Sequence, residues 1–137
     1  MDTTNVFSVS GSALAAQRQR MNVIASNMAN AHSTRTADGG PYRRQDVVFT
    51  TDPADAGRPG LDGVKVSSVV RDESPFRMVY EPAHPDANQD GFVAMPNVNV
   101  IEEMVNMMMA SRAYEASVST FNISKAMFMK TMELGRV

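Results

Sequence analysis

The chain lacks the residue types on which several classes of site depend. Its 137 residues include no cysteine, no tryptophan and only two histidines. The absence of cysteine excludes a disulfide framework, a thiolate nucleophile and a cysteine-ligated metal site. His32 and His84 lie far apart in the sequence, with no acidic residue at a metal-ligand spacing. We therefore expect no catalytic dyad, no metal site and no enzymatic activity, and no residue pattern calls for a cofactor.

Long apolar runs and an excess of one charge are also missing. No run approaches the roughly 18 residues of a membrane span, and the N-terminus lacks the basic and apolar regions of a cleaved secretory signal. The net charge is only −2, with acidic and basic residues interspersed. Such a surface has no basic footprint for nucleic acid or for an anionic membrane. We expect neither a nucleic-acid partner nor a direct membrane span.

The chain does contain a long helical pattern at residues 98–134, which holds seven of its 12 methionines. Apolar residues spaced by seven are typical of helices that pair along one stripe. At about 1.5 Å per residue this helix would be on the order of 55 Å long, so it needs a partner. The stripe consists of Val100, Met107, Tyr114, Phe121 and Phe128, and Met104, Val118 and Met132 lie one turn further round, with Ile101 and Met108 alongside.

A second helical pattern, at residues 6–31, supplies that partner. Its apolar residues with the same spacing are Phe7, Leu14, Met21 and Met28, and Ile24 widens the stripe. We assign Gln17, Asn22 and Asn27 to the other faces and Asp2, Thr3 and Thr4 to the helix start. The predicted fold is mainly α, with the two terminal helices paired as an antiparallel coiled-coil-like hairpin. An ordinary helix pair in a small bundle is the alternative on periodicity alone.

The middle of the chain, residues 34–97, is rich in strand and turn signals. Residues 42–51, 64–70 and 76–80 read as extended segments, and residues 52–63 read as an exposed loop with several glycines and prolines. Two or three strands make a small sheet at most, which is too little for an enzyme with a buried cleft. We therefore divide the chain into an N-terminal helix (1–33), a small β-rich, loop-rich segment (34–97) and a C-terminal helix (98–137).

The segment from Asp86 to Asp90 resembles the opening of a calcium-binding loop. Oxygen-bearing side chains occupy positions one, three and five, and Gly91 occupies position six. Position twelve should be glutamate but is Asn97, and Pro96 interrupts the helix that should begin there. A turn stabilised by side-chain to backbone hydrogen bonds explains the same residues. We favour the turn, and a small calcium-binding interaction module is the alternative function from a different class.

Several motifs resemble those of the bacterial flagellar basal-body rod proteins, within the wider family of rod and hook axial proteins. The N-terminal motifs are residues 12–14 (SAL), 17–18 (QR), 20–21 (RM) and 23–31 (VIASNMANA). Motifs that resemble the proximal-rod members in particular are residues 34–36 (TRT), 39–45 (GGPYRRQ), 74–77 (SPFR), 79–80 (VY), 84–88 (HPDAN), 90–91 (DG), 95–98 (MPNV), 102–104 (EEM) and 111–116 (SRAYEA). The resemblance extends over almost the whole chain.

The resemblance implies a structural subunit of the proximal rod, part of the drive shaft and of the export channel. It implies export through the flagellar type III apparatus without a cleaved signal peptide, and a location in the periplasm-spanning rod. The implied partners are other rod proteins, copies of the same chain, and components of the basal-body ring and export gate. Another rod or hook axial protein is the nearest alternative.

Two sets of residues are candidates for assembly contacts. The first is the apolar set predicted to pair the helices: Phe7, Leu14, Met21, Ile24, Met28, Val100, Met104, Met107, Tyr114, Val118, Phe121, Phe128 and Met132. The second consists of charges that either contact another subunit, face the channel or remain solvated: Arg18, Arg20, Glu102, Glu103, Arg112 and Glu115.

Overall fold

The computed structural model describes residues 3–53 and 62–135. It contains two long terminal helices and four strands between them. The elements are α1 (Thr3–Ala29), β1 (Gln45–Pro53), β2 (Asp62–Arg71), β3 (Arg77–Tyr80), β4 (Phe92–Met95) and α2 (Val100–Leu134). This confirms the predicted long terminal helices and the β-containing middle segment.

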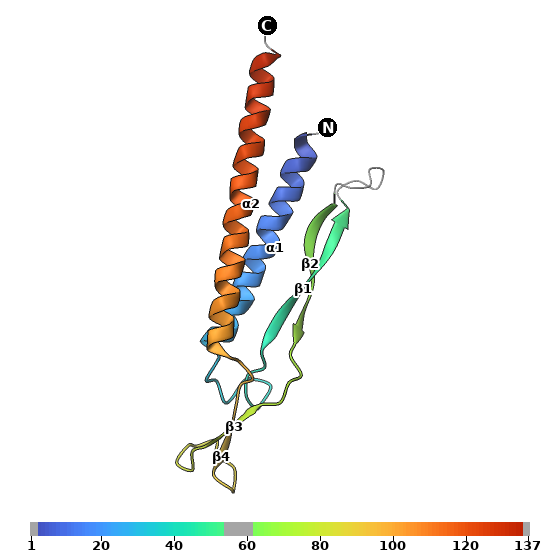
Figure 1. Ribbon diagram of the computed structural model, residues 1–137. Helices are drawn as coiled ribbons and strands as arrows, with labels where there is room; N and C mark the ends of the chain where they lie inside the picture. The colour runs from blue at the N-terminus through green and yellow to red at the C-terminus, as the bar shows by residue number, and fades with distance from the viewer. Residues whose placement is uncertain (1–2, 54–61, 136–137) are drawn as a thin grey trace.

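The two helices lie side by side and run in opposite directions (Figure 1). The ribbon formed by β1 and β2 packs along α1 on the side away from α2, so that α1 is covered on two faces. The shorter ribbon of β3 and β4 lies at the end of the molecule opposite the two termini. The result is an elongated molecule in which α2 is covered along one face.

Local sequence explains where each helix begins and ends. At the end of α1, the Asn30 side chain donates to the Ser26 carbonyl oxygen at 2.9 Å and accepts from the Ser33 hydroxyl at 3.0 Å. At the start of α2, the Asn99 side chain accepts from the Ile101 N–H at 3.1 Å, which satisfies one of the free donors of the first turn. The helix α1 starts at Thr3, so Thr3 and Thr4 lie in its first turn rather than ahead of it as capping residues; Asp2 is outside the described residues.

The strands form two separate antiparallel ribbons rather than one small sheet. In the first, β1 pairs with β2 along their whole lengths, with an irregularity between Val48 and Phe49. The predicted loop at residues 52–63 is correspondingly shorter, because its ends belong to these strands, and residues 54–61 lie outside the described part of the chain. In the second ribbon, β3 pairs with β4, a strand that the sequence analysis missed.

Two glycines permit close approaches that hold the ribbons in place. A Cβ atom at Gly63 would lie 2.7 Å from the Ser12 hydroxyl oxygen, so only glycine lets β2 come this close to α1. That hydroxyl accepts from the Val64 N–H at 3.1 Å and donates to the Val9 carbonyl oxygen at 2.7 Å. Gly91, at the turn into β4, has a φ of +80° and leaves no room for a Cβ beside the Tyr80 ring.

A group of buried and half-buried polar residues joins α1, the start of β1 and α2, and we call it the polar junction: Asn27, Tyr42, Arg44, Glu103 and the backbone of Gln45. Asn27 and Glu103 are both 0 % exposed. The Asn27 amide donates to Glu103 Oε2 at 2.9 Å and to the Gln45 carbonyl oxygen at 2.8 Å. Its oxygen accepts from the Tyr42 hydroxyl at 3.0 Å and from the Gln45 N–H at 2.9 Å. All four hydrogen-bonding positions of this side chain are thus used.

The charge of Glu103 is balanced within the chain. Its Oε1 accepts from Arg44 Nε at 2.8 Å, and the guanidinium also lies 3.3 Å from Asp46. Burial lowers the pKa of Arg44, but the hydrogen bond and charge of Glu103 and the charge of Asp46 outweigh burial, so this pKa is raised above its ordinary value. The guanidinium therefore stays charged, and the buried carboxylate has a permanent counter-charge.

The turn between β2 and β3 is held to the same region. Hydrogen bonds from the hydroxyl and the backbone N–H of Ser74 hold the pKa of the Asp72 carboxyl below its ordinary value. The Asn97 amide donates to the Asp72 and Ser74 carbonyl oxygens at 3.0 and 3.1 Å, while its oxygen accepts from the Arg44 N–H at 2.8 Å. The segment that enters α2 is thereby tied to β1 and to this turn.

We expect Asn27→Ala to lower the free energy of unfolding by about 3 kcal/mol, because it leaves several buried donors and acceptors without partners. Urea unfolding followed by circular dichroism measures this loss. Asn22→Ala, an exposed asparagine on the same helix, is the control and should have little effect. Equal unfolding midpoints for the two variants would contradict the role given to the polar junction.

Candidate assembly surface

The predicted helix-pairing residues are partly brought together. The Phe7 ring lies against Phe121, with centroids 5.2 Å apart, and against Phe128 at 6.2 Å. Leu14 and Tyr114 line one shallow cavity between the helices. Ile24 is buried, and the half-buried members of the predicted set are Phe7, Leu14, Met21, Met28, Met107, Tyr114, Val118, Phe121 and Phe128.

Three predicted pairing residues on α2 lie outside this contact. Val100 is 37 % exposed, Met104 is 52 % exposed and Met132 is 57 % exposed. The second line of covered residues on α2 is instead Glu103, Ala110, Ser117 and Ser124, also spaced by seven. Small side chains on this line leave room for the facing helix. The larger methionines accordingly lie further round α2, where the chain itself does not cover them.

The exposed apolar side chains of α2 form the most unusual surface of the molecule. We call them the outer apolar residues: Val100, Ile101, Met104, Val105, Met108, Met109, Ile123, Met127, Met129, Met132 and Leu134. Single exposed apolar residues are common, but a set of this size along one helix indicates a surface that contacts another protein. Six of them are methionines, whose unbranched side chains adapt to differently shaped neighbours.

Among the elements of residues 3–53 and 62–135, none covers the C-terminal end of α2. This helix continues past the start of α1 (Figure 1), and residues 129–134 are all exposed. They include Met129, Met132 and Leu134, the last being 78 % exposed. The projecting end is therefore apolar and available for contact.

The charged residues predicted to contact other subunits differ in how exposed they are. Arg18, Glu102, Arg112 and Glu115 are exposed, and Arg20 is half-buried. Glu103 is the exception, because it is fully buried and bonded to Asn27 and Arg44 of its own chain. In this structure its carboxylate cannot serve as a surface charge, so its assignment to subunit or channel contacts is corrected. Asn27, which we had assigned to an outer face, is likewise buried.

The turn prediction for residues 86–92 is confirmed. The Asn88 side-chain oxygen accepts from the Asp90 N–H at 3.0 Å and from the Phe92 N–H at 2.8 Å. Asp86 accepts from the Thr34 hydroxyl at 2.9 Å and pairs with Arg35 at 3.0 Å. Across residues 3–53 and 62–135, no group of three or more histidine and acidic side chains is placed to hold a metal ion.

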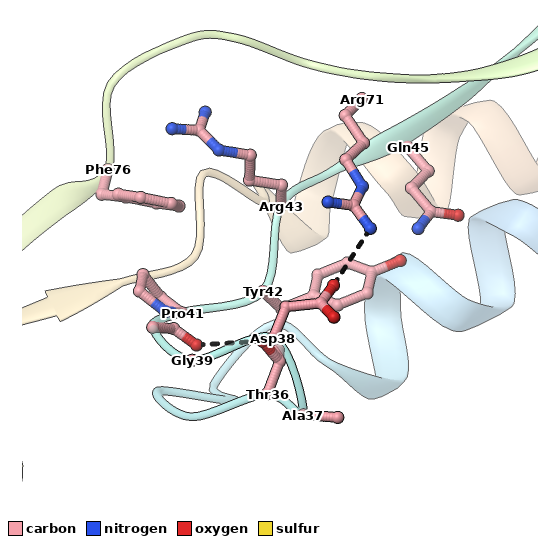
Figure 2. Close-up of a pocket in the computed structure, with 11 residues that line it drawn as sticks. Thr36, Ala37, Asp38, Gly39, Pro41, Tyr42, Arg43, Gln45, Arg71 and Phe76 are labelled. Carbon is pink, nitrogen blue, oxygen red and sulfur yellow. Dashed lines mark hydrogen bonds and ion pairs between the residues drawn. The ribbon is translucent and has the colours of Figure 1, made fainter.

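A surface cavity of about 420 Å³ lies beside the loop at residues 36–41 (Figure 2). The Arg43 guanidinium stacks over the Phe76 ring at 4.3 Å on one side, and Arg71 pairs with Asp38 at 3.3 Å on the other. Such a lining contains no nucleophile activated by a base. His32 is exposed elsewhere, and His84 Nδ1 accepts from the Asp86 N–H at 3.0 Å.

Neither terminal helix, over the residues described, combines the length and the apolar character that crossing a membrane requires.

Comparison with known proteins identifies two matching families. Residues 7–35 match the family described as flagella basal body rod protein, and residues 89–134 match the C-terminal region of the flagellar basal body rod FlgEFG proteins. The two matches cover most of α1 and the whole of α2, the elements that carry the helix contact.

The chain aligns with its relatives over almost the whole length of both sequences. The chain is 50 % identical to the flagellar basal-body rod protein FlgC of Salmonella typhimurium, over 99 % of this chain and 100 % of the relative. It is 49 % identical to FlgC of Escherichia coli O6:H1, with the same coverage, and 43 % identical to FlgC of Borreliella burgdorferi, over 93 % of this chain and 94 % of the relative. The chain belongs to the family of the flagellar basal-body rod protein FlgC.

Proposed function

We propose that this protein is a structural subunit of the proximal rod of the bacterial flagellar basal body. It assembles axially through its terminal helices, forming part of the drive shaft and of the export channel. The observation that carries this proposal is the set of outer apolar residues on α2, together with membership of the rod-protein family. A monomer that keeps so much apolar surface in water gains free energy when neighbouring subunits cover it.

The energetics support association. Full burial of one methionine, leucine or isoleucine side chain contributes roughly 1.5–3 kcal/mol. Association costs about 4–15 kcal/mol in lost translational and rotational freedom. Covering five or six of the outer apolar residues, which are already partly covered within the chain, therefore contributes a free energy of the same order as that cost without any buried charge. The predominance of methionine suits contacts that differ slightly from one neighbour to the next.

Within the subunit, we propose that the terminal helices act as an antiparallel coiled-coil-like hairpin. The packing of Phe7 on Phe121 and Phe128 supports this pairing. Residues 1–33 and 98–137 would form the axial layer, and residues 34–97 would form an outer segment with its two ribbons. Val100, Met104 and Met132, which are exposed in the isolated chain, would then contact other subunits.

We assign the exposed charges Arg18, Glu102, Arg112 and Glu115, with the half-buried Arg20, to polar contacts between subunits or to the channel surface. Charges at the rim of an apolar contact favour correct orientation more than affinity. Partners would be other rod proteins, copies of this chain, and ring and export-gate components. Delivery to the rod, outside the cytoplasm, would use the flagellar type III apparatus without a cleaved signal.

The nearest alternative is another rod or hook axial protein; identities of 43–50 % to FlgC relatives over almost the whole chain support the FlgC family over it. A calcium-binding module at Asp86–Asp90 has less support. There the Asp86 carboxylate already pairs with Arg35 and accepts from Thr34, and the Asn88 oxygen accepts two backbone N–H groups. We propose no enzymatic role and no cofactor.

We expect Phe121→Asp to prevent rod assembly, because it places a carboxylate against the Phe7 ring without a counter-charge. Motility in soft agar and electron microscopy of isolated basal bodies measure the effect. Asn122→Asp adds the same charge at the neighbouring exposed position and should leave motility intact. Normal rods in the Phe121→Asp strain would refute the proposed pairing.

Met127→Glu tests the outer apolar residues separately. Met127 is 66 % exposed, so we expect the isolated chain to keep its melting temperature within about 2 °C, while rods fail to form because the charge enters a contact between subunits. Ser119→Glu, at another exposed position of α2, is the control. If Met127→Glu supports normal motility, this part of α2 does not contact a neighbour.

We expect the terminal helices of the isolated chain to be only marginally stable. Two helices that cover one face of each other bury little apolar area, and ordering each residue's backbone costs about 1–2 kcal/mol. Circular dichroism of the dilute chain should show less helix than the 27 and 35 residues of α1 and α2, with a low melting temperature. Full helicity with a high melting temperature would contradict this expectation.

A further inference from the structure

The apolar contact between the helices leaves their alignment ambiguous. On α1, Phe7, Leu14, Met21 and Met28 recur every seven residues, and on α2 Met107, Tyr114, Phe121 and Phe128 recur at the same interval. Sliding one helix along the other by seven residues again places apolar side chains opposite apolar side chains. Aromatic and methionine side chains tolerate such rearrangement at modest cost. Another contact must therefore select one register.

Glu103 has the properties of that contact. It is a carboxylate with no exposure to solvent, and both of its oxygens are bonded, to Arg44 Nε at 2.8 Å and to Asn27 Nδ2 at 2.9 Å. Neither partner belongs to α2. A slide of α2 by seven residues would break both bonds at once and leave a charge or its partner buried and unpaired, which is strongly unfavourable.

The partners of Glu103 are held in place independently of it. The other amide hydrogen of Asn27 bonds to the Gln45 carbonyl oxygen, and its oxygen accepts from Tyr42 and from the Gln45 N–H. Arg44 is anchored through its own backbone N–H, which donates to Asn97. Together α1 and residues 42–45, which lead into β1, therefore hold a fixed binding site for the Glu103 carboxylate, which only one position along α2 places there.

We propose that Glu103, bound by Arg44 and Asn27, fixes the register of α2 against α1. This register also sets how far α2 projects past the start of α1. A change of one seven-residue repeat would alter that projection by about 10 Å. If the projecting end contacts neighbouring subunits, as proposed above, the same three residues set the spacing of that contact. Only this consequence rests on the proposed function.

Because the chain contains no cysteine, any cross-link in a variant with two introduced cysteines must join those two positions or two molecules, and cross-links within one molecule report the register. Phe7→Cys is combined in turn with Cys at residues 121, 128, 114 and 135, and the purified chain is treated at low temperature with a short thiol-reactive cross-linker, which does not require disulfide geometry. In the observed register Phe7 lies beside Phe121 and Phe128, so these two pairs should cross-link. Cross-linking to residue 114 or 135 reports a slide of seven residues in one direction or the other.

We expect Glu103→Leu to raise cross-linking to residue 114 or 135 at least about tenfold over the parent. Removing one partner of a buried ion pair costs more than the 1.4 kcal/mol that a factor of ten represents. Glu102→Leu removes the same charge from the neighbouring, exposed position and is the matched control. It should leave the cross-linking pattern of the parent unchanged.

A second variant, Arg44→Leu with Glu103→Leu, separates register from stability. Replacing both members of a buried ion pair with apolar residues is often neutral for stability, so we expect helix content to persist while the shifted cross-links appear. Cross-links confined to residues 121 and 128 in this folded variant would overturn the proposal and assign the register to the segment that enters α2. Loss of helix in both variants would also overturn it, because the junction would then be needed for folding itself.

Cross-linking in the purified chain does not depend on rod assembly. A failure of the proposed rod function, tested by Phe121→Asp in cells, is therefore distinguishable from a failure of this proposal.

Discussion

The burial of the Glu103 carboxylate is the constraint on which the arrangement of this protein depends. Moving a carboxylate out of water costs several kcal/mol unless a counter-charge and hydrogen bonds replace its hydration. Arg44 and Asn27 supply both; Arg44 immediately precedes β1, and Asn27 lies in α1. One side chain therefore connects the two ends of the chain through the strand that follows the first helix. The rest of the helix contact consists largely of half-buried apolar groups, which are less selective about alignment.

The two helices differ in how much of their surface the chain covers. The helix α1 has α2 on one side and the β1–β2 ribbon on the other, and Ser12 and Gly63 allow the ribbon to approach closely. Of the elements in the described part of the chain, α1 alone packs along α2, and the remaining faces of α2 carry exposed methionine, isoleucine, valine and leucine side chains. This asymmetry makes α2 the element that neighbouring molecules would cover, and it matches what a subunit of a larger assembly requires.

The middle segment holds the two terminal helices in position. The β1–β2 ribbon braces α1, the Asp72–Ser74 turn is bonded to Arg43 and Asn97, and the Asn88 turn leads into β4. Buried Pro96 and Val98 then lead into α2. These local contacts set the point at which the last helix starts, and the polar junction lies within one turn of it.

The sequence by itself determined the two long helices, the positions of three strands and the Asn88 turn, because each depends on local spacing or on turn chemistry. Periodicity also identified the line through Met107, Tyr114, Phe121 and Phe128. It did not decide which neighbouring line faces α1, because the lines offset by three and by four residues lie on opposite sides of this one and α2 is apolar on most sides. Nor did it reveal β4, a four-residue strand that only pairing with β3 makes visible. The roles of Asn27 and Glu103 were decided by tertiary structure alone. They lie 76 residues apart, and a lone polar side chain on a helix is predicted to face water unless its distant partners are known.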